Sequence, residues 1–319
     1  DVLRLWVSSV DYSADVPIGA GILRQLADVY RKVRNTSRYL LGNLHDFNPA
    51  TDAIPVQDLP LLDRWMLQRT AEVMDEITAA FDSFEFFRFF QLLQNYCVTD
   101  LSNFYLDIAK DRLYVSAPAD PRRRSCQTVM ALIIERLAGL IAPVLCHMAE
   151  DIWQNLPYPV AEHSVFRRGW PAVPEDWRND TLVVHIQQLR DLRASVNKVL
   201  EDCRSRQELG ASLEAAVRID SRDPDLQAAL DWLHDNGDRD VDGLRDWLLV
   251  SQLQLGGEPW AEVLASQEDD SAVIEVAHAR GTKCARCWHV EGDVGQHNEH
   301  PDLCGRCVDV LGRRRHQLA

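Results

Sequence analysis

Four cysteines near the end of this 319-residue chain limit its possible folds more than any other feature. They form two C-x-x-C pairs, Cys284 with Cys287 and Cys304 with Cys307, and residues 288–303 separate the pairs. Each pair can form a tight turn that directs two thiolates inward, and structural Zn²⁺ takes four such ligands at about 2.3 Å. The spacing therefore predicts one structural zinc ion, bound by these four cysteines in a zinc ribbon over residues 281–319.

Two other interpretations of this cysteine pattern stay open at this point. A C-x-x-C pair is also typical of thioredoxin-like redox sites, although such a pair stands beside a βαβ unit and is not doubled. Alternatively, a histidine could replace one of the sulfur ligands, and the candidates are His289, His297 and His300. A site with four protein ligands leaves no position for water, so we expect the metal to fold this segment and not to catalyse a reaction.

Residues 19–156 have the apolar periodicity of long amphipathic helices. Apolar side chains recur at i, i+3 and i+4 over 22–44, 62–84, 84–111 and 129–152, and prolines within 49–60 and 118–121 interrupt the pattern. Four long helices joined by short loops predict an antiparallel bundle. The third stretch is rich in Phe and Tyr, with only Arg88 as an interleaved basic residue. We therefore interpret its aromatic side chains as core and not as a platform for stacked bases.

The rest of the chain changes character twice. Residues 157–179 contain four prolines and few periodic apolar positions, which predicts a linker. In residues 180–280, a helix over 180–203 precedes shorter patterns, with strands expected at 213–220, 247–255 and 273–279 and a helix at 224–235. We therefore predict a mainly α protein, in which an antiparallel helical bundle is followed by a small α+β unit and a C-terminal zinc ribbon.

Motifs and apolar runs exclude several classes of protein. No apolar run approaches the roughly 20 residues that a membrane helix needs. The sequence has no G-x-x-x-x-G-K-[ST], G-x-G-x-x-G, H-E-x-x-H or G-x-S-x-G motif, so we assign no catalytic residue. Paired cysteines in a chain with a sizeable core and no secretory leader indicate the cytoplasm. Asp1 lies inside an apolar pattern, which indicates a piece of a longer protein.

The net charge of −15 superficially argues against a nucleic-acid partner. The acidic excess is concentrated in residues 204–280, however, and residues 281–319 do not share it. Two local groups are therefore candidate contacts for RNA phosphates and bases, one on a single face of the first long helix and one around the cysteine pairs. They are Arg31, Arg34 and Arg38, and Lys283, Arg286, Trp288, His289 and Arg306. A solvated surface is the competing interpretation, as it is for the basic runs 122–124 and 313–315.

Several segments of the chain resemble a known family. DVLRLWVSSVDYS, VYRKVRNTSRYLLGNL and LLDRWMLQR are similar to the region that follows the KMSKS loop in class I isoleucyl-, valyl- and leucyl-tRNA synthetases. KCARCWHVEGDVG with the later CGRC resembles the C-terminal zinc module of bacterial-type isoleucyl-tRNA synthetases, and a related finger occurs in formamidopyrimidine-DNA glycosylases. NKVLEDCRSRQELGASLEAAV is also similar to the isoleucyl enzymes, so the resemblance covers essentially the whole chain.

The resemblance implies a role for each part of the chain. Residues 1–18 would end the segment that links the catalytic core, residues 19–156 would be the helical anticodon-binding domain, and residues 180–280 and 281–319 would complete the contact with isoleucine tRNA. In the family, the HIGH and KMSKS signatures, which bind ATP, and the editing domain lie upstream, so ATP and Mg²⁺ are expected only in that catalytic part. We therefore expect a tRNA-binding monomer, joined to its own catalytic and editing domains, with no membrane partner. By itself it would neither activate isoleucine nor edit valine.

Three alternatives remain at this point. In a valyl-tRNA synthetase the chain typically ends in a helical arm, so the terminal ribbon counts against that enzyme. A free-standing zinc protein related to the repair glycosylases would need a catalytic amine at its own N-terminus, and the similarity of residues 1–45 would be unexplained. The third alternative is an interaction module with structural zinc and no nucleic-acid partner, which would not bind tRNA.

Overall fold

The computed structural model, which describes residues 1–238 and 243–317 and side chains up to residue 312, divides the chain into two units. The first comprises Asp1–Ala109 and Arg123–Asn179, and the second comprises Lys110–Arg122 and Asp180–Ala319. Residues 110–122 therefore belong with the C-terminal part of the chain, although in the sequence they lie between helices of the predicted bundle.

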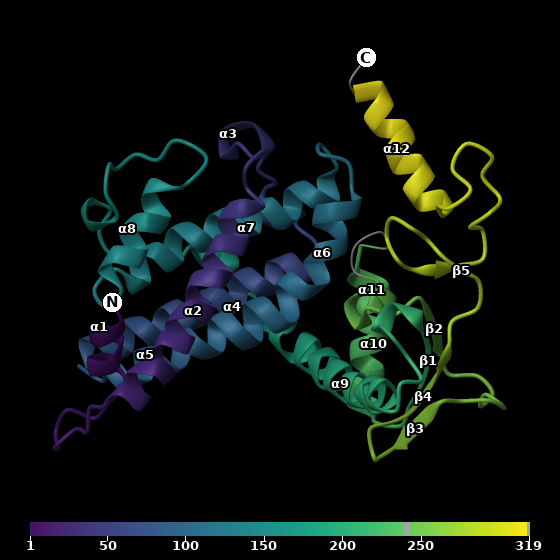
Figure 1. The fold of residues 1–319 in the computed structure, drawn as a ribbon, viewed down its shortest axis with the longest axis horizontal. Coiled ribbons are helices and arrows are strands. Elements are labelled where there is room, and N and C mark those ends of the chain that lie inside the picture. The colour runs from purple at the N-terminus through teal and green to yellow at the C-terminus, as the bar shows by residue number, and fades with distance from the viewer. Residues whose placement is uncertain (239–242, 318–319) are drawn as a thin grey trace. The chain divides into compact units, whose positions relative to one another are not determined.

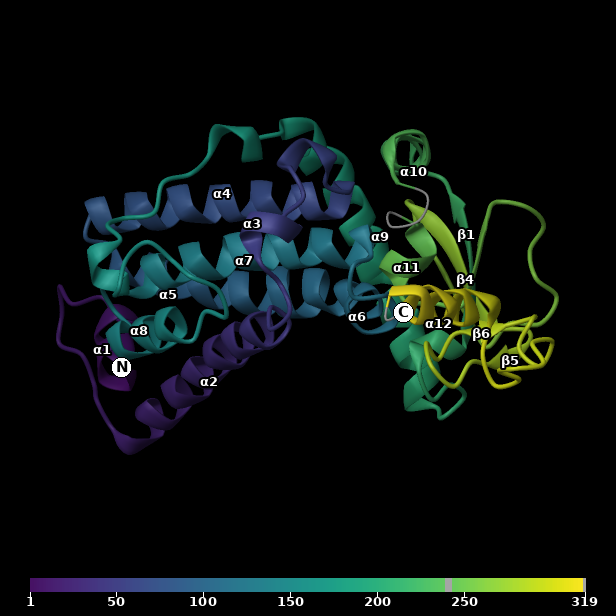
Figure 2. The ribbon, with the colours of Figure 1, turned by 90° about the horizontal axis from the view of Figure 1, so that it is seen from above.

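The first unit is built from long helices that run in alternating directions (Figures 1 and 2). In Figure 2, the axes of α4, α5 and α7 are nearly aligned, and α2 crosses them at an angle. This arrangement confirms the predicted antiparallel helical bundle in a mainly α protein. The helices of this unit are α1 (Val2–Ser8), α2 (Ala20–Gly42), α3 (Pro49–Asp52), α4 (Leu61–Asp82), α5 (Phe86–Asn95), η2 (Tyr96–Tyr105), α7 (Pro121–Ile141) and α8 (Cys146–Gln154), with short turns at η1 (Val56–Asp58), η3 (Val165–Arg167) and η4 (Glu175–Trp177). Helix α6 (Leu106–Val115) begins in this unit and continues into the second, and α7 begins in the second.

The core of the bundle follows the apolar stripes of its helices. Helix α7 is strongly enclosed, because most of its side chains are buried. Trp65 of α4 packs edge to face against Phe104, with the ring centroids 5.1 Å apart. The interpretation of the aromatic third stretch as core is confirmed for Phe89 and Phe104, which are buried, whereas Phe84 and Phe87 are exposed.

The third stretch also contains a widened segment, η2, which is a π-helix. In a π-helix the backbone bonds span five residues, so the turn is wider than that of an α-helix. The Ser102 hydroxyl supports this geometry because it donates to the carbonyl of Cys97, five residues earlier, at 2.8 Å. The Thr36 hydroxyl of α2 lies 2.9 Å from the Ser102 hydroxyl and ties α2 to the widened turn.

The basic residues 123 and 124 stabilise the bundle from within. Arg123 donates two hydrogen bonds to the carboxylate of Asp46, at 2.5 and 2.9 Å. Arg124 donates to the backbone carbonyl of Asp46 at 2.8 Å. Together these bonds fix the connection that follows α2 against the first turn of α7. These two arginines therefore hold the bundle together and are not a free basic surface.

Residues 157–179 form an irregular strap that packs along the bundle. Trp177 is buried, and the guanidinium of Arg136 lies over its ring at 4.6 Å from the centroid. The indole N–H of Trp170 donates to the hydroxyl of Thr78 at 2.9 Å. The strap lacks long helices, as its prolines indicate, yet aromatic side chains hold it in place.

The second unit is centred on a four-stranded mixed sheet with the order β2-β1-β4-β3. β1 is parallel to β2 and antiparallel to β4, with Val217 opposite Val276 and Ile219 opposite Ile274. These four side chains are buried, and α9 packs against β3 and β4. The predicted small α+β unit is thereby confirmed. Its elements are α9 (Asp180–Ser205), η5 (Ser212–Glu214), β1 (Ala215–Ser221), α10 (Pro224–Asn236), α11 (Leu244–Leu248), β2 (Gln252–Leu255), β3 (Ala265–Glu268) and β4 (Ala272–His278).

Two features of this sheet differ from the sequence-based prediction. The sequence predicts one strand over 247–255, but Trp247 and Leu248 end helix α11, and Leu249 adopts a left-handed conformation with φ of 55°. Only Gln252–Leu255 form β2. Periodicity cannot separate a short buried helix from a strand, which explains this error. β3 is absent from the prediction because its sequence, ASQE, has a single apolar residue.

The C-terminal end of the second unit is a small hairpin followed by a helix. The hairpin pairs β5 (Thr282–Lys283) with β6 (Val290–Glu291), and the helix is α12 (Gly305–Gln317). The Val290 N–H donates to the hydroxyl of Ser251 at 2.7 Å, and Arg245 pairs with Glu291 at 3.1 Å. These bonds attach the hairpin to α11 and to the residue that precedes β2. Among the residues that the structure describes, no helix combines the length and apolar character needed to cross a membrane.

Candidate metal centre and nucleic-acid interface

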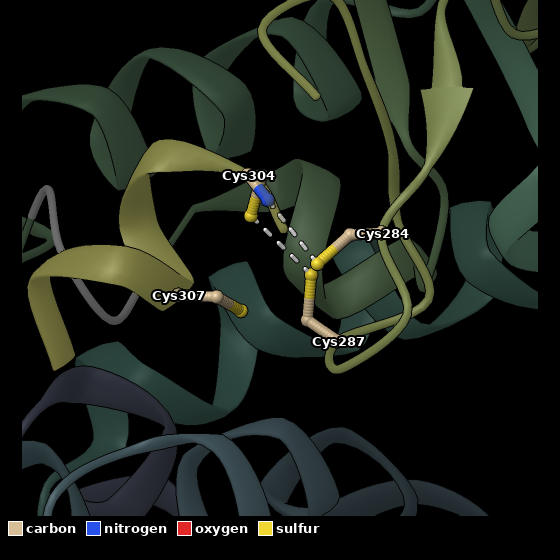
Figure 3. Close-up of side chains that lie close together, drawn as sticks. All are labelled: Cys284, Cys287, Cys304 and Cys307. Atoms are coloured by element: carbon tan, nitrogen blue, oxygen red, sulfur yellow. Dashed lines mark hydrogen bonds between the residues drawn. The ribbon is translucent and has the colours of Figure 1, made fainter. Parts of the chain in front are cut away.

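The four cysteines predicted as metal ligands converge on one point (Figure 3). Cys284 and Cys287 lie in the turn between β5 and β6, whereas Cys304 precedes α12 and Cys307 lies in its first turn. All four are buried, and their Sγ atoms lie within 4.8 Å of one another. The Sγ atoms of Cys287 and Cys304 are 3.7 Å apart. A tetrahedron with metal–sulfur bonds of about 2.3 Å has edges of about 3.8 Å, so the group fits one tetrahedral Zn²⁺.

Backbone hydrogen bonds close both cysteine pairs into tight turns. In the first pair, the Cys284 N–H donates to the carbonyl of His289 at 2.8 Å, and the Trp288 N–H donates to the carbonyl of Cys284 at 3.0 Å. In the second pair, the Val308 N–H donates to the carbonyl of Cys304 at 3.1 Å. The Cys304 N–H also points at the sulfur of Cys284, at 3.4 Å (Figure 3). Such an N–H stabilises negative charge on a thiolate.

Gly305, inside the second pair, is closely approached by a carboxylate. The Gly305 N–H donates to Oδ2 of Asp293 at 2.8 Å. A Cβ added to Gly305 would lie only 2.8 Å from the same oxygen. The Nε2 atom of His297 lies 3.3 Å from the same Asp293 oxygen. The loop between the two cysteine pairs is thereby fastened to the start of α12.

Burial and the neighbouring sulfurs shift the pKa values of three of the four thiols. The pKa of Cys287 is lowered, because the thiol of Cys307 donates a hydrogen bond to it and because Arg306 lies beside it. The pKa of Cys307 is raised, since its proton is held between the two sulfurs and since the thiol is buried. Burial also raises the pKa of Cys304. A cation bound at the centre would replace these shared protons.

The histidines proposed as substitute ligands lie outside the thiol group. The group of potential ligand atoms found around Cys284 in the described part of the chain consists of cysteines alone. His289 is buried, and burial lowers its pKa. His297 is engaged with Asp293. The geometry therefore favours four sulfur ligands over a set that contains a histidine.

Trp288 stands out among the candidate RNA contacts because it is both exposed and strained. It follows the buried Cys287 directly, and yet 61% of its surface is accessible to solvent. Its φ of 67° lies in the left-handed region, which is rare for a bulky residue. A conformation of this kind costs roughly 1–3 kcal/mol and is found mostly at functional sites. Trp288 thus presents a large flat ring to solvent at an energetic cost.

The structure turns two of the predicted RNA-contacting arginines inward. Arg306 forms two parallel hydrogen bonds with the carboxylate of Asp111, at 2.7 and 2.8 Å. Arg286 donates to the backbone carbonyl of Val115. His289, a further candidate, is only 3% exposed. These three side chains therefore contribute to packing inside the second unit.

The other predicted contacts are exposed. Lys283 lies on the surface and pairs with Glu214 at 3.1 Å. Arg31, Arg34 and Arg38 are exposed on α2, on the side away from its buried residues. Arg31 also pairs with Asp28 in the preceding turn. The side chains of the basic run 313–315 lie outside the described ones.

Sequence reasoning missed Asp111 and Val115, which belong to this site. Val115 is buried in one cluster with the four cysteines, and Asp111 binds Arg306. Both residues lie in a stretch that reads as an ordinary amphipathic helix, far from the cysteines in the sequence. No local signal distinguishes Asp111 from the other acidic residues of the bundle, so a single sequence cannot reveal this contact.

Two known families match this chain, one over most of the helical bundle and the start of the second unit and one over the segment with the four cysteines. Residues 63–219 match the anticodon-binding domain of tRNA ligase. Residues 281–310 match the zinc finger found in FPG and IleRS, and this segment contains all four cysteines of the buried group.

Curated relatives extend the similarity to the whole chain. The chain is 85% identical over 318 residues to the isoleucine–tRNA ligase of Parasynechococcus marenigrum strain WH8102, which covers 100% of the chain and 33% of the relative. It is 78% identical to that of Prochlorococcus marinus strain MIT 9313 and 76% identical to that of Synechococcus sp. strain CC9311, in each case over 98% of the chain and 32% of the relative. The chain therefore spans about a third of the length of the curated relatives that it matches.

Proposed function

Because this chain belongs to the isoleucine–tRNA ligase family, we propose that it is the tRNA-binding part of such an enzyme and contacts the anticodon region of isoleucine tRNA. Its similarity covers the C-terminal third of the relatives, which are isoleucine and not valine ligases, so the valyl alternative is set aside. Similarity along essentially the whole chain also argues against a free-standing zinc protein.

The complete enzyme would join isoleucine to its tRNA with ATP, in the cytoplasm. ATP and Mg²⁺ would bind to the catalytic part, and the substrates of editing would bind to the editing domain, neither of which this chain spans. We infer that residues 1–18 end the segment leading from that part and that residues 19–156 form the helical anticodon-binding domain. Residues 157–179 would then connect to the junction unit (180–280) and the zinc ribbon (281–319). The proposed protein is a monomer that binds no membrane.

In the proposed ribbon, Cys284, Cys287, Cys304 and Cys307 hold one Zn²⁺. Support comes from the burial of the four sulfurs, from the 3.7 Å separation of two of them, and from the match to a zinc-finger family. A four-thiolate zinc site has no open coordination position and supplies folding energy. The metal would hold the short C-terminal segment in the shape that exposes Trp288.

The observation that carries the proposal is Trp288, whose ring is exposed and whose backbone is strained, beside the buried thiol group. Bases in a single-stranded loop are unstacked and can stack on an aromatic ring, which contributes about 1–3 kcal/mol per base. Arg31, Arg34 and Arg38 offer phosphates a second, purely electrostatic contact on α2. Such local contacts allow RNA binding despite the net charge of −15.

The test is direct binding to isoleucine tRNA at physiological salt, against the same tRNA with a changed anticodon. We expect weaker binding of the changed tRNA. Trp288→Ala should lower the affinity for isoleucine tRNA about tenfold. Phe166→Ala, which removes another exposed aromatic ring, should leave the affinity unchanged. Equal affinity for the two tRNAs would contradict the proposed recognition of the anticodon region.

The arginine face of α2 predicts a different signature. Arg34→Ala should weaken the binding of both tRNAs by a similar factor and lower the slope of log K against log salt by about 1, because one phosphate contact is lost. An unchanged slope would show that this face is solvated only.

A further inference from the structure

The two cysteine pairs share a feature that their zinc-binding role does not require. In each pair an arginine stands directly before the second cysteine, as in C-A-R-C and C-G-R-C. These residues, Arg286 and Arg306, both reach the same short stretch of chain, residues 110–117. That stretch comprises the last turn and a half of α6 and the two residues after it.

The bond between Arg306 and Asp111 is the stronger of the two contacts. Both guanidinium Nη atoms donate to the two carboxylate oxygens at 2.7 and 2.8 Å, which is the bidentate geometry of a strong ion pair. The side chains are largely buried, at 28% and 16% exposure, so solvent screens the pair only in part. The Nη2 atom of Arg122 lies 3.9 Å from the same carboxylate.

The contact of Arg286 reinforces the first pair of cysteines in the same way. Its guanidinium donates to the Val115 carbonyl, and the Val115 side chain packs into the cluster of four cysteines. Each cysteine pair thus has its own anchor on residues 110–117. On the opposite side, β6 is held by Ser251 and Arg245.

We propose that Arg286, Arg306 and Asp111 are positioning residues that clamp the zinc ribbon to residues 110–117 and so fix the direction in which Trp288 presents its ring. The proposal rests on the proposed tRNA-binding function. Trp288 is two residues from Arg286 and is joined to it by the buried Cys287, so rotation of this turn would move the ring. An arginine whose two Nη atoms are bound to one carboxylate has few donors left for a phosphate.

The clamp and a direct RNA contact by Arg306 predict opposite effects of one substitution. Asp111→Asn removes a negative charge near the RNA and frees the arginine, so a direct contact would make tRNA binding tighter. If Arg306 acts through the clamp, Asp111→Asn loosens the ribbon and weakens binding. We expect about tenfold weaker binding to isoleucine tRNA. Asp309→Asn, which removes an equal charge from an exposed position on α12, is the matched control and should not weaken binding.

Two further measurements separate positioning from folding. The zinc content of Asp111→Asn should stay at one ion per chain, because all four cysteines are retained. The exchanged pair, Asp111→Arg with Arg306→Asp, should recover most of the affinity, whereas each single change should not. In the background of Trp288→Ala, Asp111→Asn should cost little more, since its effect passes through the ring.

Tighter binding of Asp111→Asn, or an undiminished loss in the Trp288→Ala background, would overturn the clamp. Loss of zinc from Asp111→Asn together with failure of the exchanged pair would also overturn it, because Asp111 would then be a folding residue. If Trp288→Ala itself leaves the affinity of the otherwise unchanged chain intact, the proposed function fails first, which is a distinguishable result.

Discussion

Different interactions stabilise the helical bundle and the zinc ribbon. In the bundle, most of α7 is buried among apolar side chains. Among the described side chains of residues 281–312, the buried apolar residues other than cysteines are Val290 and Val310. A segment with so little apolar surface to bury cannot offset its loss of conformational entropy without a staple. The bundle is therefore a self-sufficient core, and the ribbon depends on its metal and on its anchors.

Removal of zinc should show this difference most clearly. Chelation, or Cys307→Ser, should unfold residues 281–312, because structural zinc contributes on the order of 10 kcal/mol in small modules. Hydrogen exchange should become fast there and stay slow in α4 and α7. Cys146→Ser changes a cysteine outside the four-sulfur group and is the control. Persistent protection of residues 281–312 without bound metal would show that the ribbon folds unaided.

A cavity in the bundle should have the reverse effect. Phe89 is fully buried, and its ring lies 5.1 Å from that of Phe81. Phe89→Ala should lower the free energy of unfolding of the bundle by about 3–5 kcal/mol, measured by chemical denaturation. The zinc content should remain unchanged. Loss of zinc from Phe89→Ala under conditions in which the parent chain keeps its zinc would contradict a ribbon that retains its metal independently of the bundle.

A fall in pH should lower the stability of the bundle through the carboxylate of Asp46 in particular. Burial alone would raise the pKa of Asp46, but hydrogen bonds from Arg123 and Gln127 and the charges of Arg123 and Arg124 outweigh it and lower the pKa to about 2. A lowered pKa stabilises the fold above the unfolded value near 3.8, and this contribution is lost as the pH falls from about 4 to 2.

From this pKa shift, the Asp46 carboxylate contributes about 2 kcal/mol to the free energy of unfolding. Asp46→Asn should therefore be less stable than the parent chain near pH 6, and the difference should shrink as the pH approaches 2. Denaturation followed by the helical circular dichroism signal measures both. Asp52 also lies beside Arg124, with its Oδ2 atom 3.5 Å from Nη1, so Asp52→Asn is the matched comparison. A difference that is constant with pH would show that the Asp46 charge does not stabilise the bundle.

The smallest expected effect is an increase in the stability of the ribbon. Trp288→Gly should stabilise the ribbon by about 1 kcal/mol, because glycine accepts a φ of 67° without strain, while tRNA binding weakens. Trp288→Ala keeps the strained backbone and should show the loss of binding without the gain. Thermal release of zinc, followed with a chromogenic chelator, reports the stability of the ribbon. Earlier release from Trp288→Gly than from the parent chain would mean that the ring has a structural role.

The features that the sequence does not predict depend on contacts between residues far apart in the chain. Apolar periodicity predicts the bundle helices, because a stripe of core residues is a local pattern, and cysteine spacing predicts the buried sulfur group for the same reason. The pattern does not reveal the π-helical turn at η2, since Ser102 and Thr36 look like ordinary polar residues. Nor does it reveal that Arg286 and Arg306 face inward, because their partners, Val115 and Asp111, lie in α6, far from them in the sequence.

The convergence of the four cysteines is therefore predictable from their spacing, whereas the orientation of the side chains around them is not. The exposure of Trp288 agrees with its interpretation as a candidate contact, although its role stays a prediction until binding is measured. Arg286 and Arg306 were expected as RNA contacts from the same composition. Charge alone cannot distinguish an arginine that meets solvent from one that meets a carboxylate, and only the fold decides between them.

The pairing of Asp111 with Arg306 also bears on how this protein can be rebuilt. A chimera that joins the finger of a distant relative at residue 281 would lack the contacts that anchor the finger, since the matching residues are encoded in the second half of α6. Successful transplants should carry residues 110–117 from the donor as well. Within a set of natural sequences, the residues at positions 111 and 306 should co-vary, even though 194 residues of chain lie between them.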